Sequence, residues 1–133
     1  MKKFLFLFVF LISSLSAELI NQYPTKEFVE SNIPIVDIRT KPEWIETGIL
    51  KNAITITFFD QNGRFNLNKF LTELNKKVDT TKKFALICRT ASRTAVVSDY
   101  LAHKLNYKVI NLSGGMVYAK SKNLPIVPYK TNK

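Results

Sequence analysis

The residues with the clearest chemical potential are Cys88–Thr94. Cys88 is the only cysteine in the 133-residue chain. It follows the apolar run Phe84–Ile87, which predicts a buried strand, and the residues after the segment predict a helix. Backbone N–H groups at the start of a helix attract anions and favour a thiolate over a thiol. Because Arg89 and Arg93 add positive charge, the segment predicts a nucleophilic cysteine in an anion-binding loop.

The residues around Cys88 exclude several cysteine chemistries. The only histidine, His103, lies about ten residues along the predicted helix, at ~1.5 Å per residue, so we expect a surface histidine. Papain-like acyl transfer, which needs a neighbouring base, is therefore disfavoured. No second cysteine or nearby histidine offers metal-ligand spacing, so we expect no zinc site, no other metal and no cofactor. Two chemistries remain: transfer of sulfane sulfur, and phosphate or arsenate chemistry.

The elements around this loop alternate between strand and helix. Such alternation predicts an α/β fold with a mostly parallel central sheet of about five strands and helices on both faces. The run Ile35–Val36 suits a central strand, and Asp37 and Arg39 follow at its carboxyl end, where open α/β sheets bind ligands. An ion pair that braces the loops explains these two residues at least as well as substrate contact.

Other segments give weaker signals. We expect a short edge strand at Leu19–Ile20, a helix that Thr25 caps, and a strand within Ala53–Phe59. Three phenylalanines in and after that strand are expected in core or lid packing: Phe58, Phe59 and Phe65. The helix after the cysteine loop is expected to bury Ala95, Val96, Tyr100 or Leu101, and Leu105.

The N-terminus has the pattern of a secretory signal peptide. A short basic start is followed by an apolar core, Phe4–Ile12, and then by small residues up to Ala17. We expect cleavage after Ala17, a single domain over residues 18–133, and a periplasmic or secreted location. Exported proteins usually pair their cysteines in disulfides, so a lone cysteine there is more readily explained as a reactive thiol.

The formal net charge of +10 is unusually high. Because the lysines are scattered and no nucleic-acid-binding module is present, a solvated basic surface is favoured over nucleic-acid binding. Such a surface would draw small anions toward the loop. Contact with a membrane is expected only through the signal peptide before cleavage.

Four segments in order resemble the single-domain rhodanese sulfurtransferases. Ile35–Arg39 is similar to the first strand motif of that family, and Glu43–Ile54 is similar to its next motif. Cys88–Arg93 resembles the active-site loop, and Leu112–Pro125 resembles the C-terminal glycine-pair signature. Within these motifs the chain departs from the usual residues at Ile49, Ala119 and Asn123, although asparagine tolerates left-handed backbone angles.

The resemblance implies a rhodanese-like fold and a persulfide mechanism without a cofactor. Cys88 would take the outer sulfur of a small anionic donor such as thiosulfate and pass it to a thiol, to cyanide or to a protein acceptor. The resemblance places six residues around that sulfur, as backbone, hydroxyl or cationic contacts: Arg89, Thr90, Ala91, Ser92, Arg93 and Thr94. Asp37 and Arg39 would brace the loop.

The loop length separates the related chemistries. Cys88 and Arg93 frame the six-residue C-x-x-x-x-R loop of the sulfurtransferases, whereas related phosphatases and arsenate reductases resemble it with one more residue. Sulfur transfer is therefore favoured. A cysteine-dependent arsenate reductase or phosphatase stays open as an alternative, as does a persulfide carrier in a sulfur relay that does not turn over alone.

Overall fold

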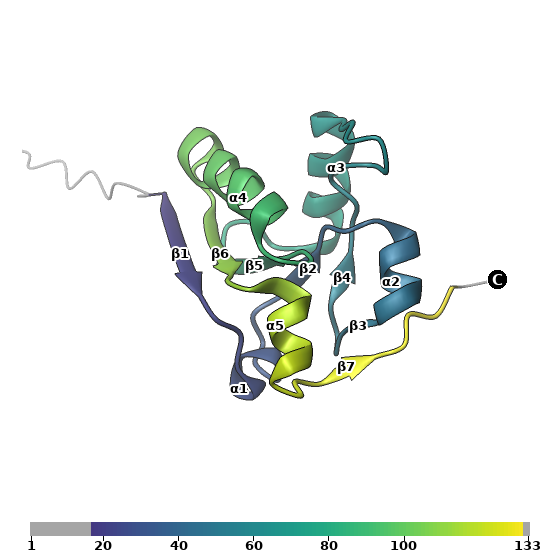
Figure 1. The fold of residues 1–133 in the computed structure, drawn as a ribbon. Coiled ribbons are helices and arrows are strands. Elements are labelled where there is room, and N and C mark those ends of the chain that lie inside the picture. The colour runs from purple at the N-terminus through teal and green to yellow at the C-terminus, as the bar shows by residue number, and fades with distance from the viewer. Residues whose placement is uncertain (1–16, 132–133) are drawn as a thin grey trace, which may run out of the picture.

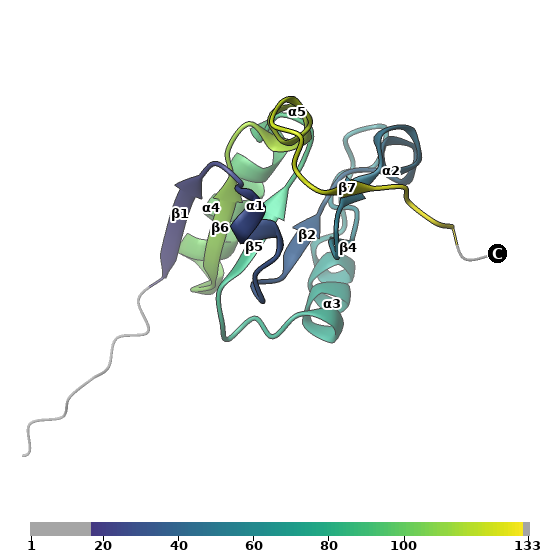
Figure 2. The same cartoon turned by 90° about the horizontal axis from the view of Figure 1, so that it is seen from below.

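The computed structural model describes residues 17–131 (Figure 1). Five parallel strands form the central sheet in the order β1-β6-β5-β2-β4, and Figure 2 shows them in that order from left to right. β3 and β7 form a separate antiparallel pair. The strands are β1 (Glu18–Gln22), β2 (Ile35–Asp37), β3 (Ile49–Leu50), β4 (Ile54–Thr55), β5 (Phe84–Ile87), β6 (Lys108–Leu112) and β7 (Ile126–Val127).

Helices cover both faces of the sheet. They are α1 (Lys26–Val29), α2 (Lys41–Thr47), α3 (Leu67–Lys77), α4 (Ser92–Leu105) and α5 (Gly115–Ser121). In Figure 1, α3 and α4 lie above the strands, and α1 and α5 lie below them. The predicted fold class and the edge position of the first strand are confirmed.

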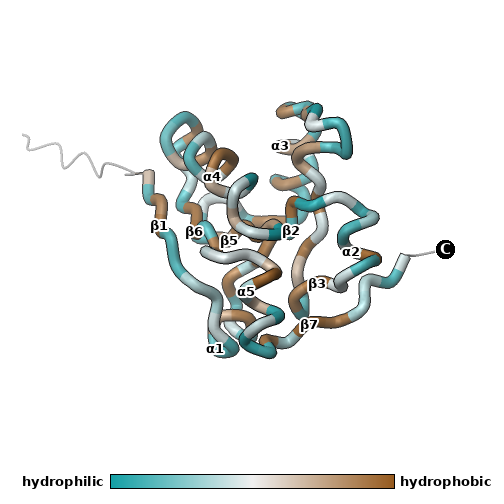
Figure 3. The backbone as a smooth tube through the Cα atoms, viewed as in Figure 1, coloured by the Kyte–Doolittle hydropathy of each residue, from teal (hydrophilic) through white to brown (hydrophobic). Residues whose placement is uncertain are grey.

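The two faces of the sheet bury separate hydrophobic clusters. Phe70 and Leu74 of α3 pack with Val97 and Leu101 of α4 on one face, and Met116 of α5 belongs to the cluster on the other. Every residue of β5 is fully buried, as a central parallel strand requires. Figure 3 shows the same pattern as hydrophobic colouring along the central strands.

Local signals set several element boundaries as expected. The Thr25 hydroxyl accepts a hydrogen bond from the Phe28 N–H and caps α1, as predicted. Asn123 adopts a left-handed φ of 51°, the backbone conformation expected from its side chain. No helix within residues 17–131 has the length and apolar character needed to cross a membrane.

Two expectations were only partly right. The strand expected within Ala53–Phe59 is present as β4, but it covers only Ile54–Thr55. The N–H groups of Ile56 and Phe58 still donate to the carbonyls of Asp37 and Ile38 before the chain enters the loop that precedes α3.

The buried face of α4 was partly misplaced: Leu101 is fully buried, as one of the two expected alternatives, but Val96 is 63% exposed and Tyr100 is 37% exposed. The other buried residues of the helix are Thr94, Val97, Ser98 and Ala102.

The proposed signal peptide lies outside the described residues, except for Ala17.

Candidate active site

Cys88 lies immediately after β5, at the carboxyl end of the central strand of the sheet. Its side chain is fully buried, and its Sγ lies 3.5 Å from the hydroxyl of Thr94. That hydroxyl is also 3.2 Å from the carbonyl of Ala91. Ala91 has a positive φ of 73°, which turns the chain sharply between the strand and α4. The turn brings Thr94, from the first turn of the helix, against the sulfur.

The backbone of the loop is open to a ligand. Helix α4 begins at Ser92, and the first N–H groups of a helix have no partner within it. Within residues 17–131, no protein acceptor is found for the N–H groups of residues 89–94. Six consecutive donors therefore stand next to Cys88, a backbone arrangement suited to negative charge.

The loop carbonyls are held from the other side by α5. The N–H of Met116 donates to the carbonyl of Cys88 at 2.9 Å, and the N–H of Val117 donates to that of Arg89 at 3.1 Å. A methyl group on Gly115 would lie 2.5 Å from each of these two oxygens. Close approach of α5 to the loop therefore requires glycine at this position.

Arg93, at the end of the loop, is bound to Glu43 of α2. Its two terminal nitrogens donate to the two carboxylate oxygens at 2.7 Å each, a paired geometry that favours strong charge-assisted bonds. The hydrogen bond from Arg93 lowers the pKa of Glu43 to about 2, although partial burial opposes this shift. The same bond raises the pKa of Arg93, and the charges of Glu43, Cys88 and Asp37 act in the same direction. Arg93 is therefore engaged in an ion pair rather than free for a donor anion.

Glu43 was quoted from the sequence only as part of a motif, and its contact with the loop was missed. It lies three residues after Thr40, whose N–H and hydroxyl donate to the same Oε1. This local capping pattern could be recognised from the sequence. The partner in the loop, 50 residues away, has no local signal.

Arg89 differs from Arg93 in having no ion pair or side-chain hydrogen bond among the described residues. It is exposed and lines a cavity of about 270 Å³ together with Lys120 and Glu46. Thr90 and Ser92 are also exposed, with their hydroxyl oxygens 3.4 Å apart. These side chains are available at the surface of the loop.

Asp37 and Arg39 form a buried ion pair at the carboxyl end of β2. The guanidinium of Arg39 donates to both carboxylate oxygens of Asp37, at 2.8–3.2 Å, and also to the carbonyl of Gly48 at 2.8 Å. The indole N–H of Trp44 donates to Asp37 at 3.1 Å. Because both charged side chains are almost fully buried, this arrangement is that of a structural brace linking β2 to α2.

His103, in the last turn of α4, makes none of the contacts described for the Cys88 loop. Its side chain is 58% exposed and faces Asp99 one helical turn away. In the part of the chain that the structure describes, no three His, Cys, Asp or Glu side chains gather where they would hold a metal ion.

Comparisons with known proteins agree with this arrangement. The model of the rhodanese-like domain family matches residues 17–122. An uncharacterised protein of Rickettsia prowazekii (strain Madrid E) is 33% identical over 92 residues, which cover 65% of this chain and 72% of that protein.

Two solved structures share the fold. A rhodanese-related protein of Thermoplasma volcanium has a TM-score of 0.58 at 23% identity, covering 84% of this chain and 99% of its own. The polysulfide-sulfur transferase homodimer of Wolinella succinogenes has a TM-score of 0.63 at 22% identity, covering 89% of this chain and 85% of its own. With the family model covering most of residues 17–131, the chain belongs to the rhodanese-like domain family.

Proposed function

We propose that the protein is a sulfurtransferase that carries sulfane sulfur as a persulfide on Cys88. The observation that carries this proposal is the loop itself: a buried thiol faced by the Thr94 hydroxyl and followed by six backbone N–H groups that have no acceptor among the described residues. Membership of the rhodanese-like family supports sulfurtransferase-type activity.

The reaction with thiosulfate balances without a cofactor or an external oxidant. The Cys88 thiolate attacks the outer sulfur of thiosulfate and forms a new S–S bond. The bond between the outer and inner sulfurs breaks, and sulfite leaves with the electron pair. Cyanide or a thiolate then attacks the outer sulfur of the persulfide, the Sγ–S bond breaks, and the Cys88 thiolate is restored.

The loop residues have separable roles in this proposal. The N–H groups of residues 89–94 would donate to the negative outer sulfur, as preorganised donors do where charge accumulates. Arg89, which has no ion pair within residues 17–131, would hold the sulfonate end of the donor. Arg93 would act by fixing the end of the loop against Glu43, which revises its expected role as a direct donor contact.

The size of the site favours a slender donor. Cys88 has no exposed surface, so only a small or extended group can bring sulfur to the thiol. The six-residue loop also favours attack on a terminal sulfur atom over binding of phosphate or arsenate inside the loop. The name of the Wolinella relative adds polysulfide to thiosulfate as a donor to test.

Export is part of the proposal and is supported by the basic start, apolar core and small residues that end at Ala17. A periplasmic or secreted location is oxidising and favours disulfides. Because Cys88 is the only cysteine in the chain, it has no partner for an internal disulfide there. N-terminal sequencing of the protein recovered from the periplasm should begin at Glu18.

Mass spectrometry tests the sulfur chemistry most directly. After treatment with thiosulfate, the protein should gain one sulfur atom on Cys88, and Cys88→Ser should gain none. Added cyanide should remove the sulfur and release thiocyanate. If sulfur is loaded but small acceptors do not remove it, the protein is a relay carrier. Hydrolysis of an aryl phosphate or reduction of arsenate without sulfur loading would contradict the proposal.

A further inference from the structure

Strand β4 lies at one end of the central sheet, opposite β1, and its outer edge is open. The N–H groups of Ile56 and Phe58 donate to carbonyls of β2 and the residue after it, at 3.1 Å each. Since backbone groups alternate in direction along a strand, those of Thr55 and Thr57 point away from β2. Within residues 17–131, no backbone partner is found for either of them. Two N–H and two C=O groups are therefore available for another strand.

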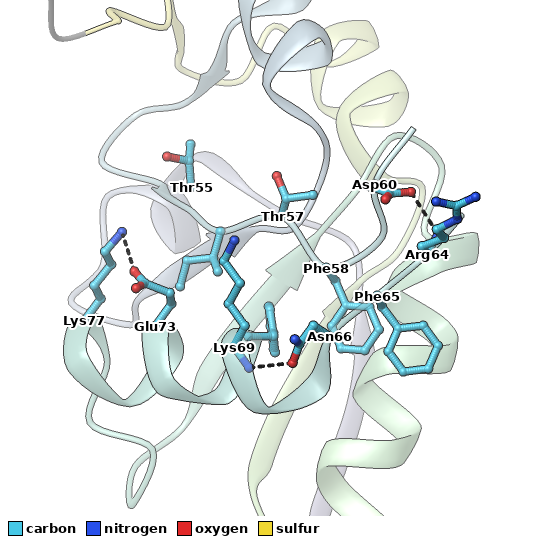
Figure 4. A pocket seen from close by; sticks show the side chains of 12 residues that line it. Thr55, Thr57, Phe58, Asp60, Arg64, Phe65, Asn66, Lys69, Glu73 and Lys77 are labelled. Atoms are coloured by element: carbon cyan, nitrogen blue, oxygen red, sulfur yellow. Dashed lines mark hydrogen bonds and ion pairs between the residues drawn. The ribbon is translucent and has the colours of Figure 1, made fainter. Parts of the chain in front are cut away.

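This edge borders a cavity of about 500 Å³ between β4 and α3 (Figure 4). In Figure 4, Lys69, Glu73 and Lys77 extend from α3 toward the strand that carries Thr55 and Thr57. Aromatic rings, among them Phe58 and Phe65, line its far end. The cavity is thus lined by backbone hydrogen-bonding groups of the β4 edge, by charged side chains of α3 and, at one end, by aromatic rings.

The charge of the cavity favours an acidic occupant. Lys69 and Arg64 have no ion pair among the described residues, whereas Lys77 lies 3.5 Å from Glu73. Asp60 accepts hydrogen bonds from backbone N–H groups of its own loop and keeps its charge. The lining therefore carries three cations, Arg64, Lys69 and Lys77, against the two anions Asp60 and Glu73, which leaves one positive charge in excess. A second copy of the chain would bring the same cations and a similar excess of basic residues, so a different, acidic partner fits better.

The cavity leads toward the active-site loop. Phe58 and Phe65 also line an apolar groove of about 160 Å³ with Val96 and Tyr100 of α4. Val96 is 63% exposed and lies one helical turn after Ser92, where the helix leaves the loop. A chain that follows the β4 edge past these rings therefore approaches the residues around Cys88.

We propose that the open β4 edge binds an extended acidic segment of the protein that exchanges sulfur with Cys88. The segment adds a strand to the sheet, so that backbone hydrogen bonds supply affinity and Lys69 selects acidic side chains. The identity of the partner rests on the proposed function. The binding surface itself does not.

A synthetic peptide of alternating Glu and Val, with both termini capped, is a suitable probe. A peptide of the same length with Lys in place of Glu is its control. In isotope-labelled protein, the acidic peptide should shift the amide resonances of Thr55 and Thr57 and bind at least about fivefold more tightly than the basic peptide. Lys69→Glu should reverse this preference. Lys76→Glu makes the same charge change on α3 outside the cavity and should alter binding less than about twofold.

Thr55→Pro removes one outward N–H without removing a bond to β2, and proline is tolerated at such edge positions. This variant should lose peptide binding while thiocyanate formation from thiosulfate and cyanide is unchanged. If it does not fold, the reversal by Lys69→Glu decides the matter alone.

Three results would overturn the proposal: no shift with millimolar acidic peptide, equal binding of both peptides, or a concentration-dependent dimer that Lys69→Glu or Thr55→Pro abolishes. Peptide binding by Cys88→Ser without any sulfur loading of the unaltered protein would retain the surface and reject the proposed function. Sulfur loading without peptide binding would retain the proposed function and reject the binding surface.

Discussion

The ion pair between Glu43 and Arg93 makes a prediction that tests how the loop is held. Glu43→Gln keeps the shape of the side chain but removes the charge that faces the guanidinium. One hydrogen bond from the charged guanidinium to the neutral amide oxygen would replace two bonds between opposite charges at 2.7 Å. We therefore expect the variant to fold but to be less stable.

The size of the effect follows from the pKa of Glu43. Its fall from 4.5 to about 2 in the folded protein sets a ceiling of about 3 kcal/mol on the stabilisation from ionising this carboxyl. Both side chains remain about a quarter exposed, so water weakens the pair, and we expect a loss of about 2 kcal/mol near neutral pH. For a domain of this size the loss corresponds to a fall of about 5–10 °C in Tm.

Urea denaturation of the two proteins over a range of pH is the decisive assay. Because the folded-state pKa is depressed, the stabilisation is complete above the ordinary value of 4.5 and is lost as the pH falls toward 2. The unfolding free energies of the two proteins should therefore converge between about pH 5 and pH 2. The reasoning would be refuted if the unfolding free energies of the two proteins differed by less than about 0.5 kcal/mol near neutral pH. It would also be refuted if their difference stayed constant down to about pH 2.

Three further substitutions separate the parts of the site. Asp37→Asn leaves the neighbouring buried guanidinium without its carboxylate and should lower the unfolding free energy by about 3–5 kcal/mol in urea denaturation; a loss below about 1 kcal/mol would contradict a buried brace. Gly115→Ala forces a methyl group against the loop carbonyls and should lower persulfide formation far more than Gly63→Ala, where the φ is also positive but the space is open. Arg89→Gln should raise the KM for thiosulfate about tenfold with little change in Tm, since it loses one charge-assisted contact, whereas Arg93→Gln should mainly lower Tm; the opposite pattern would exchange their proposed roles.

The strand, the loop and the start of α4 could be predicted because their signals are local. A four-residue apolar run, a cysteine among small polar residues, and a following helical segment identify this unit without any distant contact. The parallel sheet followed from the alternation of such units. Their order in the sheet depends on long-range pairing and was not predicted.

The buried face of α4 was misjudged because its sequence offers two apolar stripes one residue apart. Val96 and Val97 are adjacent, as are Tyr100 and Leu101, and each step rotates the helix by about 100°. The structure selects the stripe with Val97 and Leu101, although it also buries polar Thr94. The same rotation places the Thr94 hydroxyl 3.5 Å from the Cys88 sulfur, a contact that hydropathy alone does not predict.

The contacts of the loop also bear on where specificity arises. β5 positions its beginning, α5 holds two of its carbonyls, and Glu43 fixes Arg93 at its end. A loop restrained at three places has little freedom to adapt to different donors or acceptors. Discrimination is then expected from side chains that have no ion pair in the described part of the chain, namely Arg89 beside the loop and Lys69 at the β4 edge. Substitutions of these two residues should change which molecules exchange sulfur, whereas substitutions of the restraining residues should change how well any of them does.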